Sequence, residues 1–106
     1  MAKYLITGSY TSEGTKGLLK EGGSSRKATI EKALNALGGT LEAFYYAYGD
    51  ADVVLIADIP DVVSGLALSL AANASGTVNV RTTPLITVAD VDAACKKAVV
   101  YRGAGA

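Results

Sequence analysis

Six polar side chains in this sequence could bind or transform a small molecule, and they come from four separate segments. They are Thr7, Ser9, Tyr46, Tyr48, Asp58 and Arg81. A guanidinium binds a carboxylate or phosphate through two parallel hydrogen bonds. Phenols and hydroxyls donate and accept hydrogen bonds, and a carboxylate can act as a general acid or base. The set is therefore a candidate ligand-binding site for an anionic or partly apolar small molecule.

The chain contains no histidine and only one cysteine, Cys95. This removes the commonest general base and the commonest metal ligand, and it excludes a structural zinc site. We therefore expect no metal and no cofactor, and any chemistry would depend on carboxylates, Tyr, Lys, Ser or Thr. Cys95 lies on the apolar stripe of an expected helix, where an inert buried thiol is the usual outcome.

Several of these residues also have a purely structural interpretation. Arg81 could pair with Glu42 across a dimer as readily as with an anionic ligand. Tyr46 and Tyr48 are typical of amphipathic interface anchors as well as of phenols that contact a substrate. The run Gly-Gly-Ser-Ser-Arg at residues 22–26 resembles an anion-binding nest, but it lacks the spacing of a phosphate loop, which favours a helix break followed by a cap.

The length of 106 residues predicts one domain with a single core. We expect residues 1–101 to form this domain and residues 102–106 to be a flexible tail. Ten basic and ten acidic residues give no excess positive charge, so we expect no nucleic-acid partner. No apolar run is long enough to cross a bilayer, which predicts a cytoplasmic protein without a membrane partner.

Hydrophobic periodicity gives the expected order of strands and helices. Strands are predicted at 3–10, 41–48, 53–59 and 77–86, helices at 26–37, 62–75 and 87–99, and a weaker helical run at 15–21. Two β-α-β halves joined head to tail describe a ferredoxin-like split βαβ fold. The predicted class is therefore α+β, a βαββαβ sandwich with an extra C-terminal helix.

The alternation of side chains along the strands predicts one face covered by helices and one open face. The residues assigned to the helix-covered face are Leu41, Ala43, Tyr45, Ala47, Val78 and Val80. Those assigned to the open face are Leu5, Thr7, Ser9, Glu42, Phe44, Tyr46, Tyr48, Val54, Ile56, Asp58, Asn79, Arg81 and Thr83. The strand at 53–59 is apolar on both sides, which is typical of burial on both faces. A second copy is the simplest cover for the open face, so we expect a homodimer or a higher multiple.

The strands at 41–48 and 53–59 form a hairpin that we expect at the centre of the sheet. Its turn contains Gly49, Asp50 and Ala51, and Gly49 is a residue that can adopt positive φ. Asp50 and Asp52 could be a carboxylate pair for acid–base work or for a cation. An aspartate in the turn and another at the start of the strand are the simpler interpretation, and we favour it.

This turn, Gly-Asp-Ala-Asp-Val-Val from Gly49, resembles the signature of the GYD-domain family of small bacterial proteins. Further similarity comes from residues 9–14, 16–26, 37–39 and 74–76, so the resemblance covers roughly residues 4–101. One position departs from the signature, because Ala51 stands where the family has tyrosine. Any functional contribution of that tyrosine would be missing here, whereas a structural role of the Gly49 turn survives.

The resemblance implies a ferredoxin-like fold, usually in a dimeric α/β barrel, and no assigned reaction. The wider fold includes cofactor-independent oxygenases, muconolactone-type isomerases, haem-degrading enzymes and ligand-sensing domains. The absence of histidine and tryptophan argues against the haem-degrading type.

Our first functional hypothesis is a small-molecule-binding module that acts as a homo-oligomer. The alternatives are an oxygenase or isomerase using Tyr46, Tyr48, Ser9 or Asp58, and an assembly component without a site.

Overall fold

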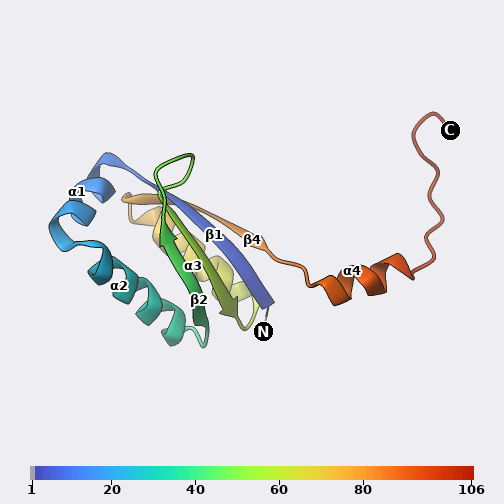
Figure 1. Ribbon diagram of the computed structural model, residues 1–106, viewed down its shortest axis with the longest axis horizontal. Coiled ribbons are helices and arrows are strands. Elements are labelled where there is room, and N and C mark those ends of the chain that lie inside the picture. Colours follow the sequence, from blue (N-terminus) through green and yellow to red (C-terminus); the bar gives the residue numbers. More distant parts are fainter. Residues whose placement is uncertain (1) are drawn as a thin grey trace.

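The computed structural model describes residues 2–106 as four strands and four helices (Figure 1). The elements are β1 (Ala2–Tyr10), α1 (Ser12–Glu21), α2 (Gly23–Ala36), β2 (Thr40–Tyr46), β3 (Val53–Ile59), α3 (Val62–Ala74), β4 (Val78–Pro84) and α4 (Val88–Cys95). This order confirms the predicted α+β succession, with the weak helical run at 15–21 extended into a complete helix, α1.

The four strands form one antiparallel sheet in the order β2-β3-β1-β4. This order is the ferredoxin-like arrangement, so the predicted fold class is confirmed. The central strands are β1 and β3, and only one strand of the β2–β3 hairpin is therefore central, contrary to the prediction. Pro84 ends β4, an edge strand of the sheet, where proline is tolerated.

Three of the helices begin directly after a residue whose side chain caps them. The side chains of Thr11, Asp61 and Thr87 each accept a hydrogen bond from the backbone amide three residues on, at 3.2, 2.7 and 3.0 Å. These bonds satisfy amides that have no partner inside the helix. The caps fix where α1, α3 and α4 leave the preceding strands or loops.

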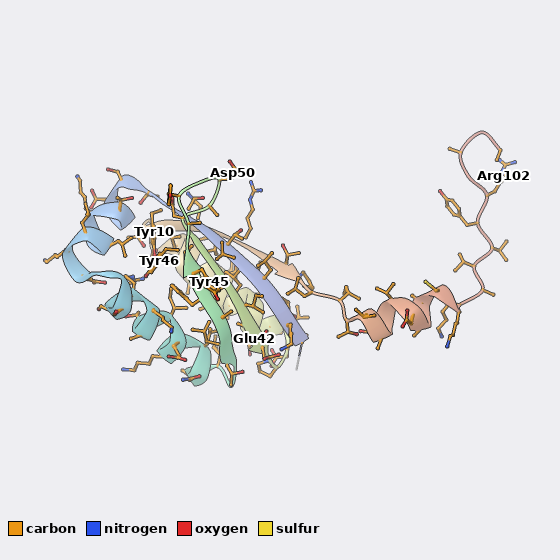
Figure 2. The ribbon with its side chains drawn as sticks, viewed as in Figure 1. Tyr10, Glu42, Tyr45, Tyr46, Asp50 and Arg102 are labelled. Atoms are coloured by element: carbon orange, nitrogen blue, oxygen red, sulfur yellow. The ribbon has the colours of Figure 1, made fainter. Side chains whose placement is uncertain are left out.

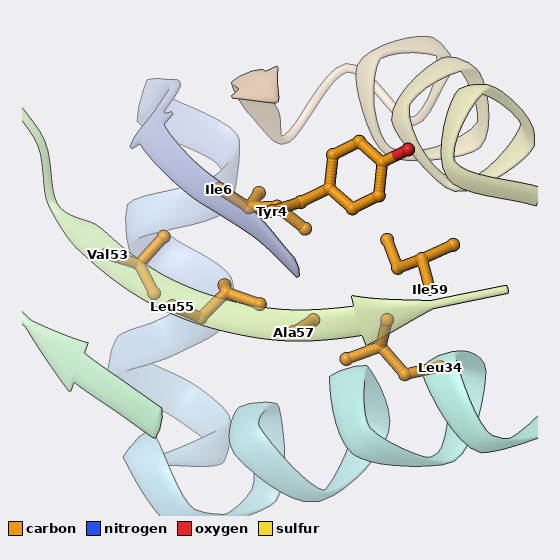
Figure 3. Packing of buried hydrophobic residues seen from close by; sticks show 7 residues of the cluster. All are labelled: Tyr4, Ile6, Leu34, Val53, Leu55, Ala57 and Ile59. Atoms are coloured by element: carbon orange, nitrogen blue, oxygen red, sulfur yellow. The ribbon is translucent and has the colours of Figure 1, made fainter. Parts of the chain in front are cut away.

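The hydrophobic core lies between the sheet and the helices α2 and α3 (Figure 3). Its buried members are Tyr4, Ile6, Leu34, Val53, Leu55, Ala57 and Ile59. Alternate residues of β1 and β3 supply six of these seven, so the helix-covered face of both strands is as predicted. Leu34 is the contribution of α2, whose apolar stripe the sequence also predicted.

The face assignment of β2 is right for Leu41 and Glu42 and wrong from Ala43 onward, because a bulge interrupts the strand. Leu41 lies opposite Ala57, but Ala43 lies opposite Ile56, so one extra residue stands between them. A single inserted residue moves every side chain that follows it to the opposite face of the sheet from the one that strict alternation predicts. Phe44 therefore packs against the core instead of facing the open side.

The C-terminal segment from Ile86 onward leaves the body of the molecule, and all its residues are exposed (Figure 1). Helix α4 ends at Cys95, four residues before the predicted end at Val99. The prediction that Cys95 is a buried core residue is wrong, because no other part of the described chain covers its helix.

Candidate functional site

Three of the six predicted site residues lie together in a hollow of about 770 Å³ on the open sheet face. Its lining consists of Thr7, Ser9, Asp50, Ala51, Asn73, Asn79, Val80 and Arg81. The predicted residues in this group are Thr7, Ser9 and Arg81. They come from neighbouring strands, which explains why residues so distant in sequence share one surface.

Strand register brings these side chains together. Thr7 of β1 lies opposite Arg81 of β4, and Ser9 lies opposite Asn79. Odd-numbered residues of antiparallel partners then point to the same side of the sheet. Within residues 2–106, Arg81 forms no ion pair. Glu42 pairs with Lys3 of the same chain at 3.2 Å, and pairing of Arg81 with Glu42 of a second copy stays a prediction. The guanidinium is therefore available for an anion.

The loop between β2 and β3, residues 47–52, contributes Asp50 and Ala51 to the lining of this hollow, and Figure 2 labels Asp50 in the loop. Ser9 Oγ donates a hydrogen bond of 3.2 Å to the carbonyl oxygen of Asp50. The carboxylate of Asp52 accepts a bond of 2.8 Å from the Tyr10 amide, and the Asp52 amide donates at 2.8 Å to the Gly8 carbonyl. Asp52 thus fastens the loop to β1, which agrees with its structural interpretation.

Gly49 does not adopt the positive φ that was expected at this position of the turn. Positive φ occurs within residues 2–106 only at Gly22, Gly38, Gly76 and Gly105. The strand β2 ends at Tyr46 and the loop has six residues, so the connection is wider than the predicted tight turn.

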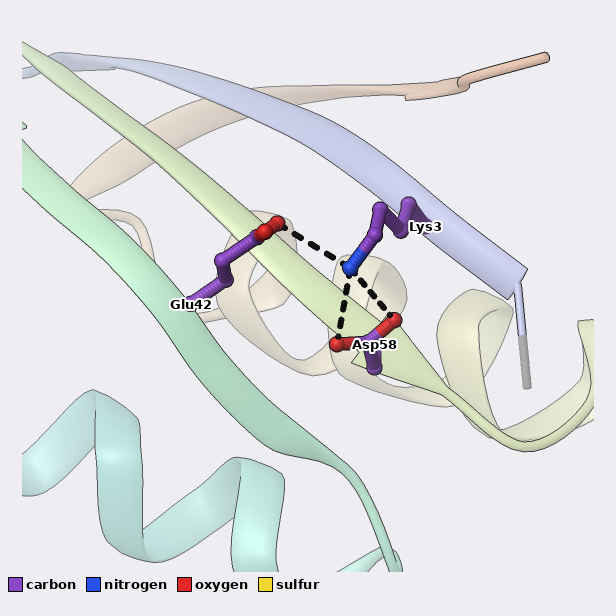
Figure 4. A network of polar contacts seen from close by, with 3 residues as sticks. All are labelled: Lys3, Glu42 and Asp58. Carbon is purple, nitrogen blue, oxygen red and sulfur yellow. Dashed lines mark hydrogen bonds and ion pairs between the residues drawn. The ribbon is translucent and has the colours of Figure 1, made fainter. Parts of the chain in front are cut away.

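Asp58 lies at the other end of the open face, in an ion-pair network with Lys3 and Glu42 (Figure 4). Lys3 Nζ is 3.2 Å from both carboxylate oxygens of Asp58. These hydrogen bonds, with a smaller contribution from Glu42, raise the pKa of Lys3. Asp58 pairs with Lys3 of β1, and Arg81 pairs with Thr7 of the same strand. Lys3 and Thr7 are four residues apart along β1, which corresponds to roughly 13 Å. Asp58 is therefore not part of the hollow.

The two predicted tyrosines also lie outside the hollow. Tyr46 was assigned to the open face, but the β2 bulge places it on the helix side, where its hydroxyl donates a 2.8 Å hydrogen bond to the Gly23 carbonyl. Burial raises the pKa of this phenol. Tyr48 is fully exposed in the loop and is absent from the lining of the hollow.

Asn73, Asn79 and Ala51 line the hollow and were not predicted as site residues. The side chain of Asn73 on α3 accepts a hydrogen bond of 2.7 Å from the Val80 amide, which covers part of the sheet edge. Asn79 shares the strand alternation of Arg81, so periodicity alone could have added it to the candidate site. Asn73 carries no such signal, because its position depends on how α3 crosses β4.

Residues 2–106 contain no group of three or more His, Cys, Asp or Glu side chains close enough to hold a metal ion. Within this range, no helix has both the length and the apolar character that a membrane span requires.

Comparison with known proteins gives one family. The family model described as GYD domain matches residues 4–95 of the 106. No curated protein and no solved structure shows significant similarity. Because the family model covers most of the sequence, including the loop and all four strands, the chain belongs to the GYD domain family.

Proposed function

We propose that this protein is a small-molecule-binding module that works as a homo-oligomer, with the ligand held on the open sheet face. The observation that carries this proposal is the Arg81 guanidinium, which has no ion-pair partner within residues 2–106 and lies beside the Thr7 and Ser9 hydroxyls. A guanidinium flanked by hydroxyls suits a small molecule with an anionic group. Ala51 and Val80, the two apolar residues that line the hollow, could contact a small apolar part of such a ligand.

The proposed homo-oligomer explains what covers the open face. Val54 and Ile56 of the central strand β3 point to this face and are only partly buried, and Tyr45 beside them is 70% exposed. Two such faces packed together would bury these side chains and enclose both hollows. This arrangement is the dimeric α/β barrel that the family resemblance implies.

The separation of Tyr46, Tyr48 and Asp58 supports binding over cofactor-independent catalysis. General acid–base catalysis needs groups within hydrogen-bonding reach of one reacting atom. Asp58 is paired with Lys3, Tyr46 contacts α2, and Tyr48 points into solvent. We keep a cytoplasmic location within the proposal, since a chain with one cysteine does not depend on disulfides.

Native mass spectrometry of the freshly purified protein tests this function. We expect an even number of subunits that retains an additional small mass. The Arg81→Gln variant should lose this mass and keep the subunit number, whereas Arg102→Gln, in the exposed C-terminal segment, should keep both (Figure 2). Retention of the same mass by Arg81→Gln would contradict the assigned site. A wild-type oligomer without any bound mass would favour the assembly alternative.

A further inference from the structure

A second hollow lies on the opposite, helix-covered side of the sheet, between α2 and α3. Its volume is about 300 Å³. Helix α2 packs over β2 and α3 packs over β4, so the space between the helices lies above the central strands. The floor is formed by Ile6, Val53, Leu55 and Val80, and the walls by Ile30 of α2 and Leu68 of α3. We call this hollow the interhelical cleft.

Polar groups gather at one end of the interhelical cleft. Arg26 and Tyr10 line it there, together with the hydroxyls of Ser75 and Thr77, which lie 2.8 Å apart. The guanidinium of Arg26 is partly buried, and within residues 2–106 its one ion-pair partner is Glu21, at a long 3.5 Å. Charge-assisted pairs with good geometry are shorter, at about 2.7–2.9 Å. Arg26 can therefore accept a second anionic partner on its inner side.

Tyr10 is held in place beside this arginine by its own backbone. Its amide donates to the Asp52 carboxylate at 2.8 Å, and β1 ends at this residue. Burial raises the pKa of the Tyr10 phenol, an effect that the nearby Arg26 opposes only in part. The phenol therefore stays protonated at neutral pH and offers an O–H donor toward the cleft.

We propose that the interhelical cleft binds an amphipathic carboxylate, with its head group at Arg26 and Tyr10 and its apolar body over Ile6, Leu68 and Val80. The volume matches roughly ten non-hydrogen atoms, because one water-sized unit occupies about 30 Å³. An apolar lining with a few convergent polar groups at one end is typical of small-molecule sites. The interhelical cleft and the hollow at Arg81 share only Val80 among their lining residues, and their arginines, Arg26 and Arg81, line different hollows.

A titration of the full-length, ¹⁵N-labelled protein with sodium octanoate tests the proposal. We expect saturable chemical-shift changes at the amides of Ile30, Leu68 and Ala72, which line the interhelical cleft and not the hollow at Arg81. Arg26→Gln should weaken binding at least about tenfold, because a charge-assisted hydrogen bond is lost. The matched control Lys27→Gln removes an exposed charge from the next residue of α2 and should bind octanoate as the wild type does. Uncharged 1-octanol should bind more weakly than octanoate.

Two further variants keep the test decisive. Ser69→Phe fills the cleft from α3 and should abolish the shifts even if Arg26→Gln folds poorly. Arg81→Gln should bind octanoate unchanged, so failure of this site is distinguishable from failure of the function proposed above. The absence of saturable shifts, shifts confined to the open face, or equal binding by Arg26→Gln would overturn the proposal. The proposal would also be overturned if these amides shifted only on protein–protein association, such as docking of another copy's C-terminal segment.

Discussion

At the scale of single residues, alanine substitutions at two buried helical glycines, Gly65 and Gly14, should change stability in opposite directions. A Cβ at Gly65 of α3 would meet only Ile59 carbons at 3.8 Å, an ordinary van der Waals distance. Alanine is favoured over glycine in helices by about 1 kcal/mol. Gly65→Ala should therefore raise the free energy of unfolding by up to about 1 kcal/mol, measured by urea denaturation.

Gly14 of α1 provides the matched contrast. A Cβ there would overlap the carbonyl oxygen of Thr77, which is backbone and cannot move aside easily. Gly14→Ala should lower the free energy of unfolding by at least about 1 kcal/mol, since overpacking of this kind costs about 1–3 kcal/mol. Equal effects of the two substitutions would contradict the close contact of Gly14 with Thr77 and the open space beside Gly65.

The residues of the candidate site were predictable to different degrees. Alternation along β1 and β4 placed Thr7, Ser9 and Arg81 on one face, because these strands are regular and their register preserves the period of two. Tyr46 was misplaced because the bulge after Leu41 has no glycine or proline to signal it. Arg26 and Tyr10 of the interhelical cleft were not recognised, since their proximity depends on tertiary packing.

At the scale of elements, the loop 47–52 depends on Asp52 far more than on Asp50. The Asp52 side chain satisfies the Tyr10 amide, whereas the Asp50 side chain is exposed and forms no hydrogen bond with the described residues. Asp52→Ala should lower the free energy of unfolding by about 1–2 kcal/mol, because one partner of a charge-assisted hydrogen bond is lost. Asp50→Ala should stay within about 0.5 kcal/mol of the wild type.

Chemical denaturation of both variants, with hydrogen exchange of the Tyr10 amide, checks this prediction. Faster exchange in Asp52→Ala alone is the expected result. If Asp50→Ala were the more destabilising change, the turn aspartate rather than the strand-start aspartate would hold the loop.

The elements themselves were largely predictable from sequence. Hydrophobic periodicity predicted all four strands, the helices α2 and α3, and the start of α4, because this signal is local in the sequence. α1 was underestimated, since two glycines lower its helix propensity while packing of Gly14 against Thr77 holds it in place. Local propensity carries no information on that contact.

At the scale of the whole molecule, the extended C-terminal segment and the open sheet face are the features that a single chain leaves unexplained. The radius of gyration is 17.1 Å, compared with about 13 Å for a compact domain of this length. The segment exposes large apolar residues, including Ile86, Val88 and Val91. Sequence alone could not show this, because an amphipathic helix has the same pattern whether it packs on its own chain or on another. Contiguous exposed apolar surface is typical of an interface.

The central claim is that a second copy covers the open face, and sedimentation equilibrium of two lysine variants tests it most directly. Ile56→Lys places a charge in the middle of that face, whereas Leu19→Lys changes an apolar side chain of α1 that is 82% exposed. We expect the wild type and Leu19→Lys to form dimers or higher multiples, and Ile56→Lys to sediment as a folded monomer with an unchanged circular dichroism spectrum. A monomeric wild type, or an Ile56→Lys variant that assembles as the wild type does, would contradict the account.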